Sequence, residues 1–265
     1  MKIGLYGIQR GSIDPAVLAA RARMAEDAGL ESVWVGDHVA LPRDLGGAQP
    51  RLDAVTAVSY LAAVTTRVRL GFGVIVVPQR HPVVLAKQVT SIDVLTGGRL
   101  IVGVGAGYVE PELRALGVPM DERGARTDEY LAAMRELWTS PEPSFEGRFV
   151  RFDGVLQPPP PVQRPHPPIV VGGHSDAAMR RAGRVGTGWY GVYVDLDETA
   201  ALLKRLRAVT GRTDLEITIT PREAVTRDVL SRYEDLGVHR LLAQPASMDD
   251  DGPERLIDTL GRLAT

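Results

Sequence analysis

The feature that most restricts the fold of this chain is a set of eight short apolar segments, each the length of a buried strand. Helical spacing or helical end signals lie between most of them, and alternating strands and helices indicate a parallel sheet. The apolar runs are continuous, which is typical of a sheet covered on both faces. Eight strands in about 250 residues fit a (β/α)8 barrel, whereas a doubly wound sheet usually has fewer. The predicted strands are residues 3–8, 31–38, 68–77, 100–105, 169–171, 189–194, 215–220 and 240–243.

Some of the intervening helices carry clear end signals. Asp14 is a candidate N-cap, Pro15 suits the first helical position, and Gly29 suits the left-handed position after the last turn. A later helix is predicted to begin at Pro82 and to end before Gly97.

A long segment after the fourth strand, roughly residues 108–168, interrupts the alternation. Phe145, Phe149 and Phe152 alternate in it as in a hairpin, and a run of prolines follows. A linker between two domains is one interpretation, but the aromatic hairpin favours an inserted flap. We therefore predict one barrel domain over residues 1–265, an α/β (β/α)8 TIM barrel whose insertion forms a flap over the barrel mouth.

Charge and cysteine content narrow the function classes. The chain has 31 Lys and Arg against 33 Asp and Glu, a net charge of -2, which favours neither nucleic acid nor an anionic membrane as partner. A small-molecule substrate fits this balance better. There is no cysteine, so thiolate catalysis and Cys-based metal sites are excluded and redox chemistry requires a bound cofactor. Zinc-protease, Walker A and serine-hydrolase motifs are absent, and we predict no metal site.

The N-terminal residues contain a single Lys and no long apolar run. We therefore expect neither a signal peptide nor a membrane span, and a cytoplasmic protein.

Asp37 and His38 lie where the second predicted strand ends. In a barrel, catalytic groups come from the C-terminal ends of strands, and histidine exchanges protons near neutral pH. This position favours a catalytic pair. A polar turn with a capping or solvent-exposed histidine is the alternative, and spacing alone leaves both open.

Three glycines, Gly103, Gly105 and Gly107, follow one another at the end of the fourth strand. Their spacing fails the dinucleotide-binding motif G-x-G-x-x-G, whose third glycine would fall at Tyr108. Small residues here allow a flat ring to approach the backbone, and a tight strand-to-loop turn explains them equally well.

The fifth strand runs into Gly172 and Gly173, then into His174, Ser175 and Asp176 as candidate helix caps. Free backbone N–H groups and the positive end of a helix dipole suit a phosphate. An ordinary capped turn is the alternative. The arginines that follow, Arg180, Arg181 and Arg184, are predicted to form a solvated helix face, and contact with an anionic cofactor tail is the alternative.

Taken together, several stretches resemble the bacterial luciferase-like oxidoreductases, and in particular their branch that uses coenzyme F420, a 5-deazaflavin. The resemblance covers essentially the whole chain. Its most specific block combines "RHPVVLAKQ", "LTGGRL" and "GVGAG", and further matches are "SVWVGDH", "SFEGRFVRFDGV", "PPIVVGG" and "GVHRLL". The family fold is a (β/α)8 barrel with an insertion after the fourth strand, and relatives imply a homodimer.

The resemblance also implies roles for individual residues. It puts Asp37 against the cofactor ring and His38 beside the reacting carbon. His38 would then donate or accept a proton, and Asp37 would orient His38 or the ring. Residues in three further segments match cofactor contacts: a strand bulge that is often a non-prolyl cis peptide in relatives, backbone contacts to the ring, and the phosphate turn. In order, these are Gly73, Val74 and Val76; Ala106 and Gly107; and Gly172, Gly173, His174 and Ser175.

Two departures from the family bear on the substrate. The similar deazaflavin-dependent sugar-phosphate dehydrogenases carry a glutamate where this chain has Tyr108, and their phosphate-binding threonine and lysine correspond here to the stretch 192–195. A sugar phosphate is therefore not the expected substrate. Tyr108 and the phenylalanines of the flap are predicted to shape the substrate pocket.

The sequence thus predicts an F420-dependent oxidoreductase that transfers a hydride between the deazaflavin and a small organic substrate. One alternative is an FMN-dependent luciferase-like monooxygenase, which would consume oxygen. The other is a non-catalytic flavin- or deazaflavin-binding protein.

Overall fold

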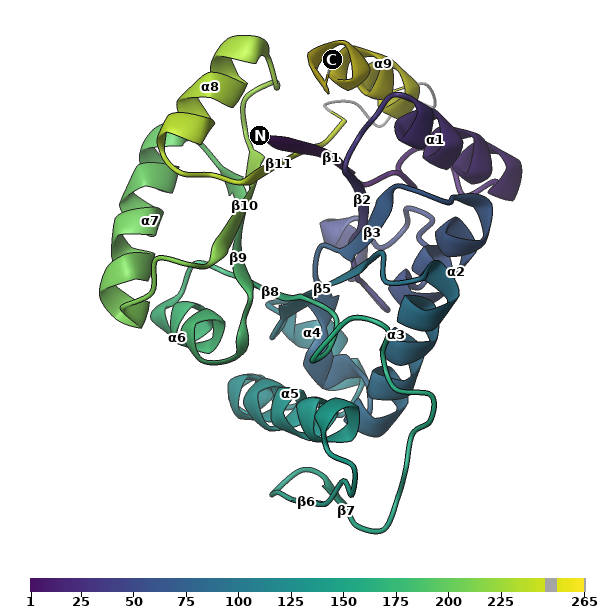
Figure 1. The fold of residues 1–265 in the computed structure, drawn as a ribbon, viewed down its shortest axis with the longest axis vertical. Coiled ribbons are helices and arrows are strands. Elements are labelled where there is room, and N and C mark those ends of the chain that lie inside the picture. The colour runs from purple at the N-terminus through teal and green to yellow at the C-terminus, as the bar shows by residue number, and fades with distance from the viewer. Residues whose placement is uncertain (246–251, 265) are drawn as a thin grey trace.

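The computed structural model describes residues 1–245 and 252–264, and its strands form a closed barrel (Figure 1). The barrel strands are β1 (Lys2–Tyr6), β2 (Ser32–Val35), β3 (Arg69–Phe72), β4 (Ile75–Val76), β5 (Leu100–Gly105), β8 (Ile169–Gly172), β9 (Gly188–Val194), β10 (Glu216–Pro221) and β11 (Arg240–Ala243). Their order is β3-β2-β1-β11-β10-β9-β8-β5-β4, all parallel, and a pairing of β3 with β5 closes the ring. With β3 and β4 counted as one position, eight positions surround the axis, which confirms the predicted (β/α)8 barrel.

The third predicted strand, residues 68–77, is broken into β3 and β4. The Gly73–Val74 peptide bond between them is cis, as the resemblance implied. The Gly73 N–H donates to the carbonyl of Val35 at 2.8 Å, so the chain stays attached to β2 at the break. Because the apolar run is continuous, hydrophobicity alone gave no sign of where the strand is interrupted.

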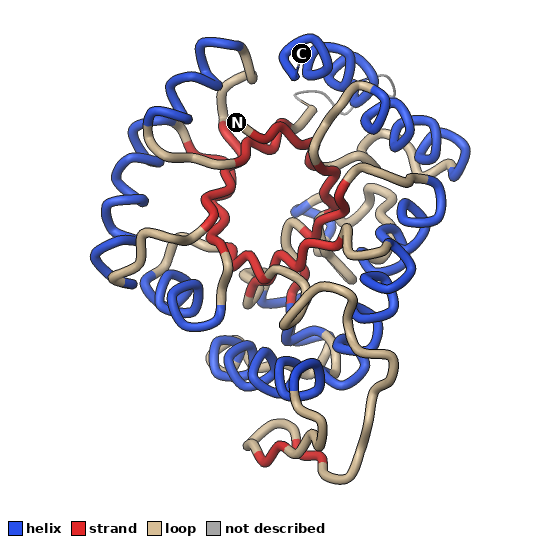
Figure 2. Tube along the Cα trace, viewed as in Figure 1, coloured by secondary structure: helices blue, strands red, loops and turns tan. Residues whose placement is uncertain are grey.

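Helices surround the strands on the outside (Figure 2). They are α1 (Pro15–Asp27), α2 (Ala54–Val64), α3 (Pro82–Thr96), α4 (Glu110–Ala115), α5 (Arg123–Thr139), α6 (Asp176–Val185), α7 (Leu196–Thr210), α8 (Arg227–Asp235) and α9 (Gly252–Ala264), with 3₁₀ turns η1 (Arg43–Leu45) and η2 (Val77–Gln79). The predicted end signals are confirmed: the Asp14 carboxylate accepts the Ala16 N–H at 2.7 Å, and Gly29 has a φ of 77°. Among the described helices, none is long and apolar enough to cross a membrane.

Bulky side chains fill the inside of the barrel. Trp34, Ile101, Val170, Tyr190 and Leu242 form a buried cluster there, and a larger apolar cluster lies between the strands and the helices. The barrel is therefore a packed core with no central pore, and a ligand site must lie at one of its ends.

The end formed by the first residues of the strands is closed by a charged side chain. Arg240 is fully buried and donates two hydrogen bonds of 2.8 Å to Glu31, and it is also paired with Glu216. Its guanidinium lies 5.6 Å from the centroid of the Trp34 ring, directly beneath the apolar filling. A site for a ligand is therefore expected at the opposite end.

The predicted flap over the barrel mouth is wrong. After β5 the chain forms α4 and then α5, which packs against α3 and α6 as the fourth helix of the barrel. The hairpin of β6 (Phe145–Glu146) and β7 (Arg151–Phe152) lies outside α5, at the bottom of Figure 1. Glu129 of α5 fixes it there by accepting the backbone N–H groups of Phe149 at 2.6 Å and Val150 at 2.8 Å. The aromatic side chains of the hairpin thus pack against the barrel core and shape no substrate pocket.

Candidate active site

Two adjoining cavities open at the C-terminal ends of the strands. The N-terminal cavity, of about 740 Å³, is formed by the loops after β1 and β2 together with Tyr108. The glycine cavity, of about 590 Å³, is formed by the loops after β2, β4, β5 and β8 and by the start of α6. Tyr6, His38 and Tyr108 line both, so the cavities meet at these side chains. Their linings are residues 6, 7, 9–14, 36, 38, 49–51 and 108 for the former, and 6, 37, 38, 73, 74, 76, 105–108, 121, 123, 124, 172–175, 177, 178, 181 and 192 for the latter.

All ten residues that the sequence assigned to cofactor binding line the glycine cavity. They come from four separate segments, and the barrel brings these segments together because parallel strands end at the same rim. The ten are Asp37, Gly73, Val74, Val76, Ala106, Gly107, Gly172, Gly173, His174 and Ser175.

Val74 occupies the floor of the glycine cavity, and its neighbours must be glycine. A Cβ atom at Gly105 would lie 2.6 Å from one Val74 methyl, and a Cβ at Gly172 would lie 2.8 Å from the other. Gly107 has a φ of 84°, and a Cβ atom there would lie 2.9 Å from a methyl group of Val76. Because Gly105, Gly107 and Gly172 have no side chains, Val74 and Val76 line the cavity between them. A flat ring could therefore lie directly on these two valines.

Asp37 is buried and holds the bulge at the end of β3. It accepts hydrogen bonds from Arg80 at 2.6 and 2.8 Å and from the backbone N–H of Val76 at 2.8 Å. Within the described residues it makes no hydrogen bond to His38. The prediction that Asp37 orients His38 is therefore corrected, because its carboxylate is already bound to Arg80 and to the bulge.

Glu112, at the start of α4, is the group that orients His38. Its Oε2 lies 3.1 Å from His38 Nδ1, and its Oε1 accepts the backbone N–H groups of Val39 at 2.6 Å and Ala40 at 3.1 Å. Burial alone would raise the pKa of Glu112, but these hydrogen bonds outweigh it and hold the pKa below its usual value. An ionised carboxylate on Nδ1 places a proton there and leaves Nε2 available for exchange.

Two tyrosines flank His38 where the cavities meet. The Tyr108 ring lies edge-on to His38 with 6.1 Å between centroids, and it is 76% exposed. Tyr6, the last residue of β1, is the other, and burial raises the pKa of its hydroxyl, so that group stays protonated and available as a donor. Both side chains can therefore contact a molecule held beside His38.

The predicted phosphate turn leads into α6. Gly173 has a φ of 118°, which suits glycine, and Ser175 caps the helix by accepting the Ala178 N–H at 3.2 Å. Asp176, the one unfavourable charge in this turn, is bound to Arg205 at 2.7 Å and does not line the cavity. The first turn of α6 therefore lies at the cavity, and the carboxylate of Asp176 is directed to Arg205.

Two expectations about this region need correction. His174 is not a helix cap: its Nε2 accepts the Val192 N–H at 3.1 Å, and burial lowers its pKa, so the ring is neutral at pH 7. Arg181 does not belong to a solvated face, because it is buried and donates to Asp128 at 2.7 Å. It lines the glycine cavity, as does Arg123, which donates to the carbonyl of Gly107 at 3.1 Å.

Sequence reasoning missed several residues of the site: Tyr6, Arg10, Arg51, Glu112 and Arg123. Arg10 and Arg51 lie in loops, Glu112 lies in a short helix, Arg123 begins α5, and Tyr6 ends β1. The one usable signal was that Tyr6 ends the first strand, just as His38 follows the second. Groups of three or more side chains suited to a metal ion do not occur in residues 1–245 and 252–264.

Comparison with known proteins gives the same family along the whole chain. A model of the luciferase-like monooxygenase family matches residues 4–247. An uncharacterised protein of Mycobacterium tuberculosis is 34% identical over 278 aligned positions and 98% of each chain. An F420-dependent glucose-6-phosphate dehydrogenase of Kineococcus radiotolerans is 33% identical over 230 residues, 82% of this chain and 65% of its own.

An FMNH2-dependent dimethylsulfone monooxygenase of Pseudomonas putida is 40% identical over 147 residues, 54% of this chain and 40% of its own. Among solved structures, the monooxygenase RslO1 of Streptomyces bottropensis superimposes with a TM-score of 0.81 at 25% identity, over 99% of this chain and 98% of its own. The chain therefore belongs to the luciferase-like monooxygenase family, an oxidoreductase family in which the relatives of this chain include both F420-dependent and FMNH2-dependent enzymes.

Proposed function

We propose that the protein is an F420-dependent oxidoreductase that transfers a hydride between the deazaflavin and a small organic substrate. The observation that carries the proposal is the convergence of ten residues from four segments on the glycine cavity, with His38 at its border. F420 is favoured over FMN because the F420-dependent relative aligns with 82% of the chain and the FMNH2-dependent one with 54%.

The glycine cavity fits a flat ring that carries an anionic chain. The ring would lie on Val74, where Gly105 and Gly172 leave no side chain in the way. A phosphate of the chain would meet the first turn of α6, near the guanidinium of Arg123, whereas Arg181 in the same lining is paired with Asp128. FMN also has a ring and a phosphate, so these contacts serve either cofactor.

F420, when bound, supplies the hydride chemistry, and the protein supplies position and a proton. His38 is assigned the proton because it lies where the two cavities meet and Glu112 holds its Nδ1. Its Nε2 then exchanges the proton with the substrate oxygen or nitrogen. Tyr6 and Tyr108 line both cavities beside His38 and would contact the bound substrate.

The first test is a parallel titration with F420 and FMN, followed by fluorescence, on the wild type and two matched variants. Ala177→Asp adds a carboxylate at the second helical position of α6, on the wall of the glycine cavity. Ala16→Asp adds one at the same position of α1, away from that cavity. An acid in the first turn is compatible with a helix, so both variants are expected to fold.

Under the proposal, F420 binds more tightly than FMN, Ala177→Asp weakens binding by about tenfold, and Ala16→Asp changes it by less than about twofold. Preference for FMN together with oxygen consumption would instead establish the second candidate, an FMN-dependent monooxygenase. That candidate rests on the 40% identity over 147 residues. Binding without hydride exchange with any acceptor would indicate a carrier protein, a role that gives the His38–Glu112 pair no purpose.

A further inference from the structure

The N-terminal cavity is lined by two arginines whose charge is not neutralised by the cavity itself. Arg10 follows β1 and Arg51 lies in the loop before α2. Of the described residues that line this cavity, only Asp14 carries a carboxylate, and it caps α1 by accepting the N–H groups of Ala16 and Val17. Arg10 and Arg51 form no ion pair within residues 1–245 and 252–264. Among the described residues, the lining of this cavity therefore carries more positive than negative charge.

Neutral acceptors hold both guanidinium groups in place. Arg10 donates to the side-chain oxygen of Gln244 at 3.3 Å and lies 5.8 Å from the Tyr6 ring centroid. Arg51 donates to the carbonyl of Gly46 at 2.7 Å and to the side-chain oxygen of Gln49 at 3.1 Å. These contacts orient the groups without cancelling their charge. A guanidinium has five N–H donors, so donors remain on each arginine for a ligand.

A glycine in the loop after β1 leaves room for the Arg10 side chain. Gly7 has a φ of 80°, and a Cβ atom there would lie 2.8 Å from the Arg10 Nε. Any other residue at position 7 would be strained at this φ, and its Cβ would force the Arg10 side chain to shift. The arginine is thus placed by the loop rather than left in solvent.

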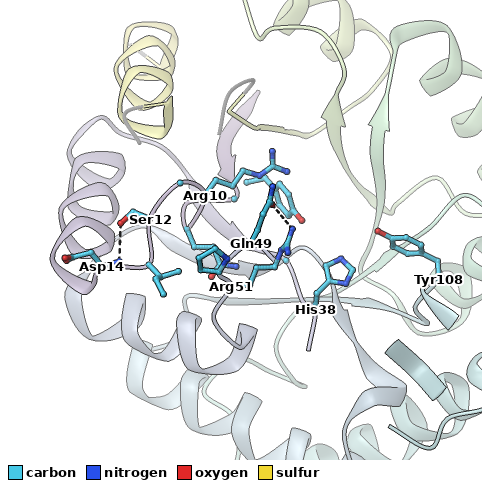
Figure 3. Close-up of a pocket in the computed structure, with 14 residues that line it drawn as sticks. Arg10, Ser12, Asp14, His38, Gln49, Arg51 and Tyr108 are labelled. Carbon is cyan, nitrogen blue, oxygen red and sulfur yellow. Dashed lines mark hydrogen bonds between the residues drawn. The ribbon is translucent and has the colours of Figure 1, made fainter. Parts of the chain in front are cut away.

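Arg10 and Arg51 lie on one side of His38, and Tyr108 lies on the other (Figure 3). Both arginines lower the pKa of the Tyr6 hydroxyl, against the larger effect of burial, so all three groups share one electrostatic environment. A cavity of about 740 Å³ holds a small organic molecule, and this one extends to His38. A molecule anchored at the arginines would reach the proton-exchanging nitrogen.

We propose that the organic substrate carries an anionic group, a carboxylate or a phosphate, which Arg10 and Arg51 bind in the N-terminal cavity. This inference rests on the proposed function in so far as the bound molecule is the hydride partner. The anion site itself does not depend on which cofactor binds. Arginine is suited to this role because its planar donors match the oxygens of both groups.

The test compares three probes of one shape: phenylacetate, phenyl phosphate and the neutral phenylacetamide. Their affinities are measured by calorimetry, with and without F420, on the wild type, Arg10→Gln, Arg51→Gln and the double variant. Arg43→Gln is the matched control, because Arg43 is an exposed arginine of the same loop that does not line the cavity. Thermal unfolding and an F420 titration on every variant check the fold and the glycine cavity.

The expected result is that at least one anion binds about tenfold or more tightly than the amide. The double variant removes this preference and Arg43→Gln keeps it, and added salt weakens the anion alone. The stronger of the two anions identifies the group. The proposal is overturned if neither anion binds better than the amide, including the case in which no probe binds, or if the double variant keeps the preference.

The two proposals fail separately. If the wild type binds F420 but shows no anion preference, the inference fails and the proposed function stands. If the anion preference depends on both arginines while neither F420 nor FMN binds, the proposed function fails and the anion site stands.

Discussion

The two ends of the barrel use the same residue type, arginine, in opposite ways. At the closed end, Arg240 is fully buried and bound to Glu31 and Glu216. At the open end, the acceptors of Arg10 and Arg51 within residues 1–245 and 252–264 are all neutral. A buried charge that lacks a partner is costly, so the closed end must pair its arginine, whereas solvent at the open end allows an unpaired charge to persist. Pairing alone does not mark a binding end, because Arg80 and Arg181 at the open end are bound to Asp37 and Asp128. Arg10 and Arg51 differ from these in that they line a cavity and have only neutral acceptors within the described residues.

The carboxylates follow the same division. Burial alone would raise the pKa of Glu31 and Glu216, but Arg240 outweighs it and lowers both. At the open end, the buried carboxylates of Asp37 and Glu112 are held by Arg80 and by His38 with backbone N–H groups. Of these, only Glu112 contacts a side chain that is itself available to a ligand. Changes at the closed end should therefore affect stability, and changes at the open end should affect activity.

The largest expected effect is the loss of activity in His38→Ala. Removal of the general acid or base should lower turnover by ~10²–10⁴-fold, while F420 affinity changes by less than about threefold. The free energy of unfolding should change by less than about 1 kcal/mol, because Glu112 keeps its two backbone donors. Turnover is followed by F420 absorbance and stability by urea unfolding. Unchanged turnover would remove His38 from the mechanism.

The opposite pattern is expected for Arg240→Met at the closed end. Loss of the guanidinium leaves Glu31 and Glu216 facing the apolar filling, which should lower the free energy of unfolding by about 3 kcal/mol. Arg10→Met is the matched change at the open end and should cost less than about 1 kcal/mol. Urea unfolding of both variants checks the difference. Equal losses would contradict the division between the two ends.

The barrel and most of the glycine cavity could be predicted from the sequence for a local reason. Apolar runs and helix caps are set by neighbouring residues, and every parallel strand then delivers its C-terminal residues to the same rim. Asp37, Gly107 and Gly173 could therefore be placed together without knowledge of the distances between them.

Other parts of the site depend on contacts between distant segments, which no local pattern reveals. Glu112 lies in a short helix of the insertion, 74 residues from the histidine that it orients. The proposed role of Arg10 in anion binding depends on the position of two loops. The loop after β1 and the loop that contains Arg51 line the same cavity. The hairpin was misplaced for the same reason: its aromatic pattern is local, but Glu129, which holds it outside α5, is not.

A third prediction concerns acid stability at the closed end. Glu26 accepts three backbone N–H groups of the turn before β3, at 2.6–2.9 Å, from Thr66, Arg67 and Val68. Burial opposes ionisation, but these bonds outweigh it and lower the pKa of Glu26 from 4.5 to about 2. Because the folded pKa is lowered, the stabilisation is complete above pH 4.5 and is lost as the pH falls toward 2.

Between pH 6 and pH 3, the stability difference between the wild type and Glu26→Gln should therefore shrink by about 2 kcal/mol. Urea unfolding at several pH values measures it. Asp27→Asn, at the next position and 76% exposed in its side chain, is the control and should show no such convergence. A constant difference between the wild type and Glu26→Gln would mean that the carboxylate is not ionised by these bonds.

The smallest expected effect separates a positioning role for Glu112 from a structural one. In Glu112→Gln a single amide oxygen cannot accept from both His38 and the two backbone N–H groups, so the Nδ1–H form of His38 loses its partner. Turnover should fall by about tenfold with KM little changed, and the ¹⁵N resonances of His38 should move toward the other tautomer. Glu129→Gln is a matched control, because Glu129 likewise accepts backbone N–H groups, three of them, but it holds the hairpin outside α5 and contacts no histidine among the described residues. If both variants lose turnover equally while the His38 resonances stay fixed, Glu112 only supports the loop. If only Glu112→Gln loses turnover, the activity depends on the orientation of the His38 ring by the buried carboxylate of Glu112.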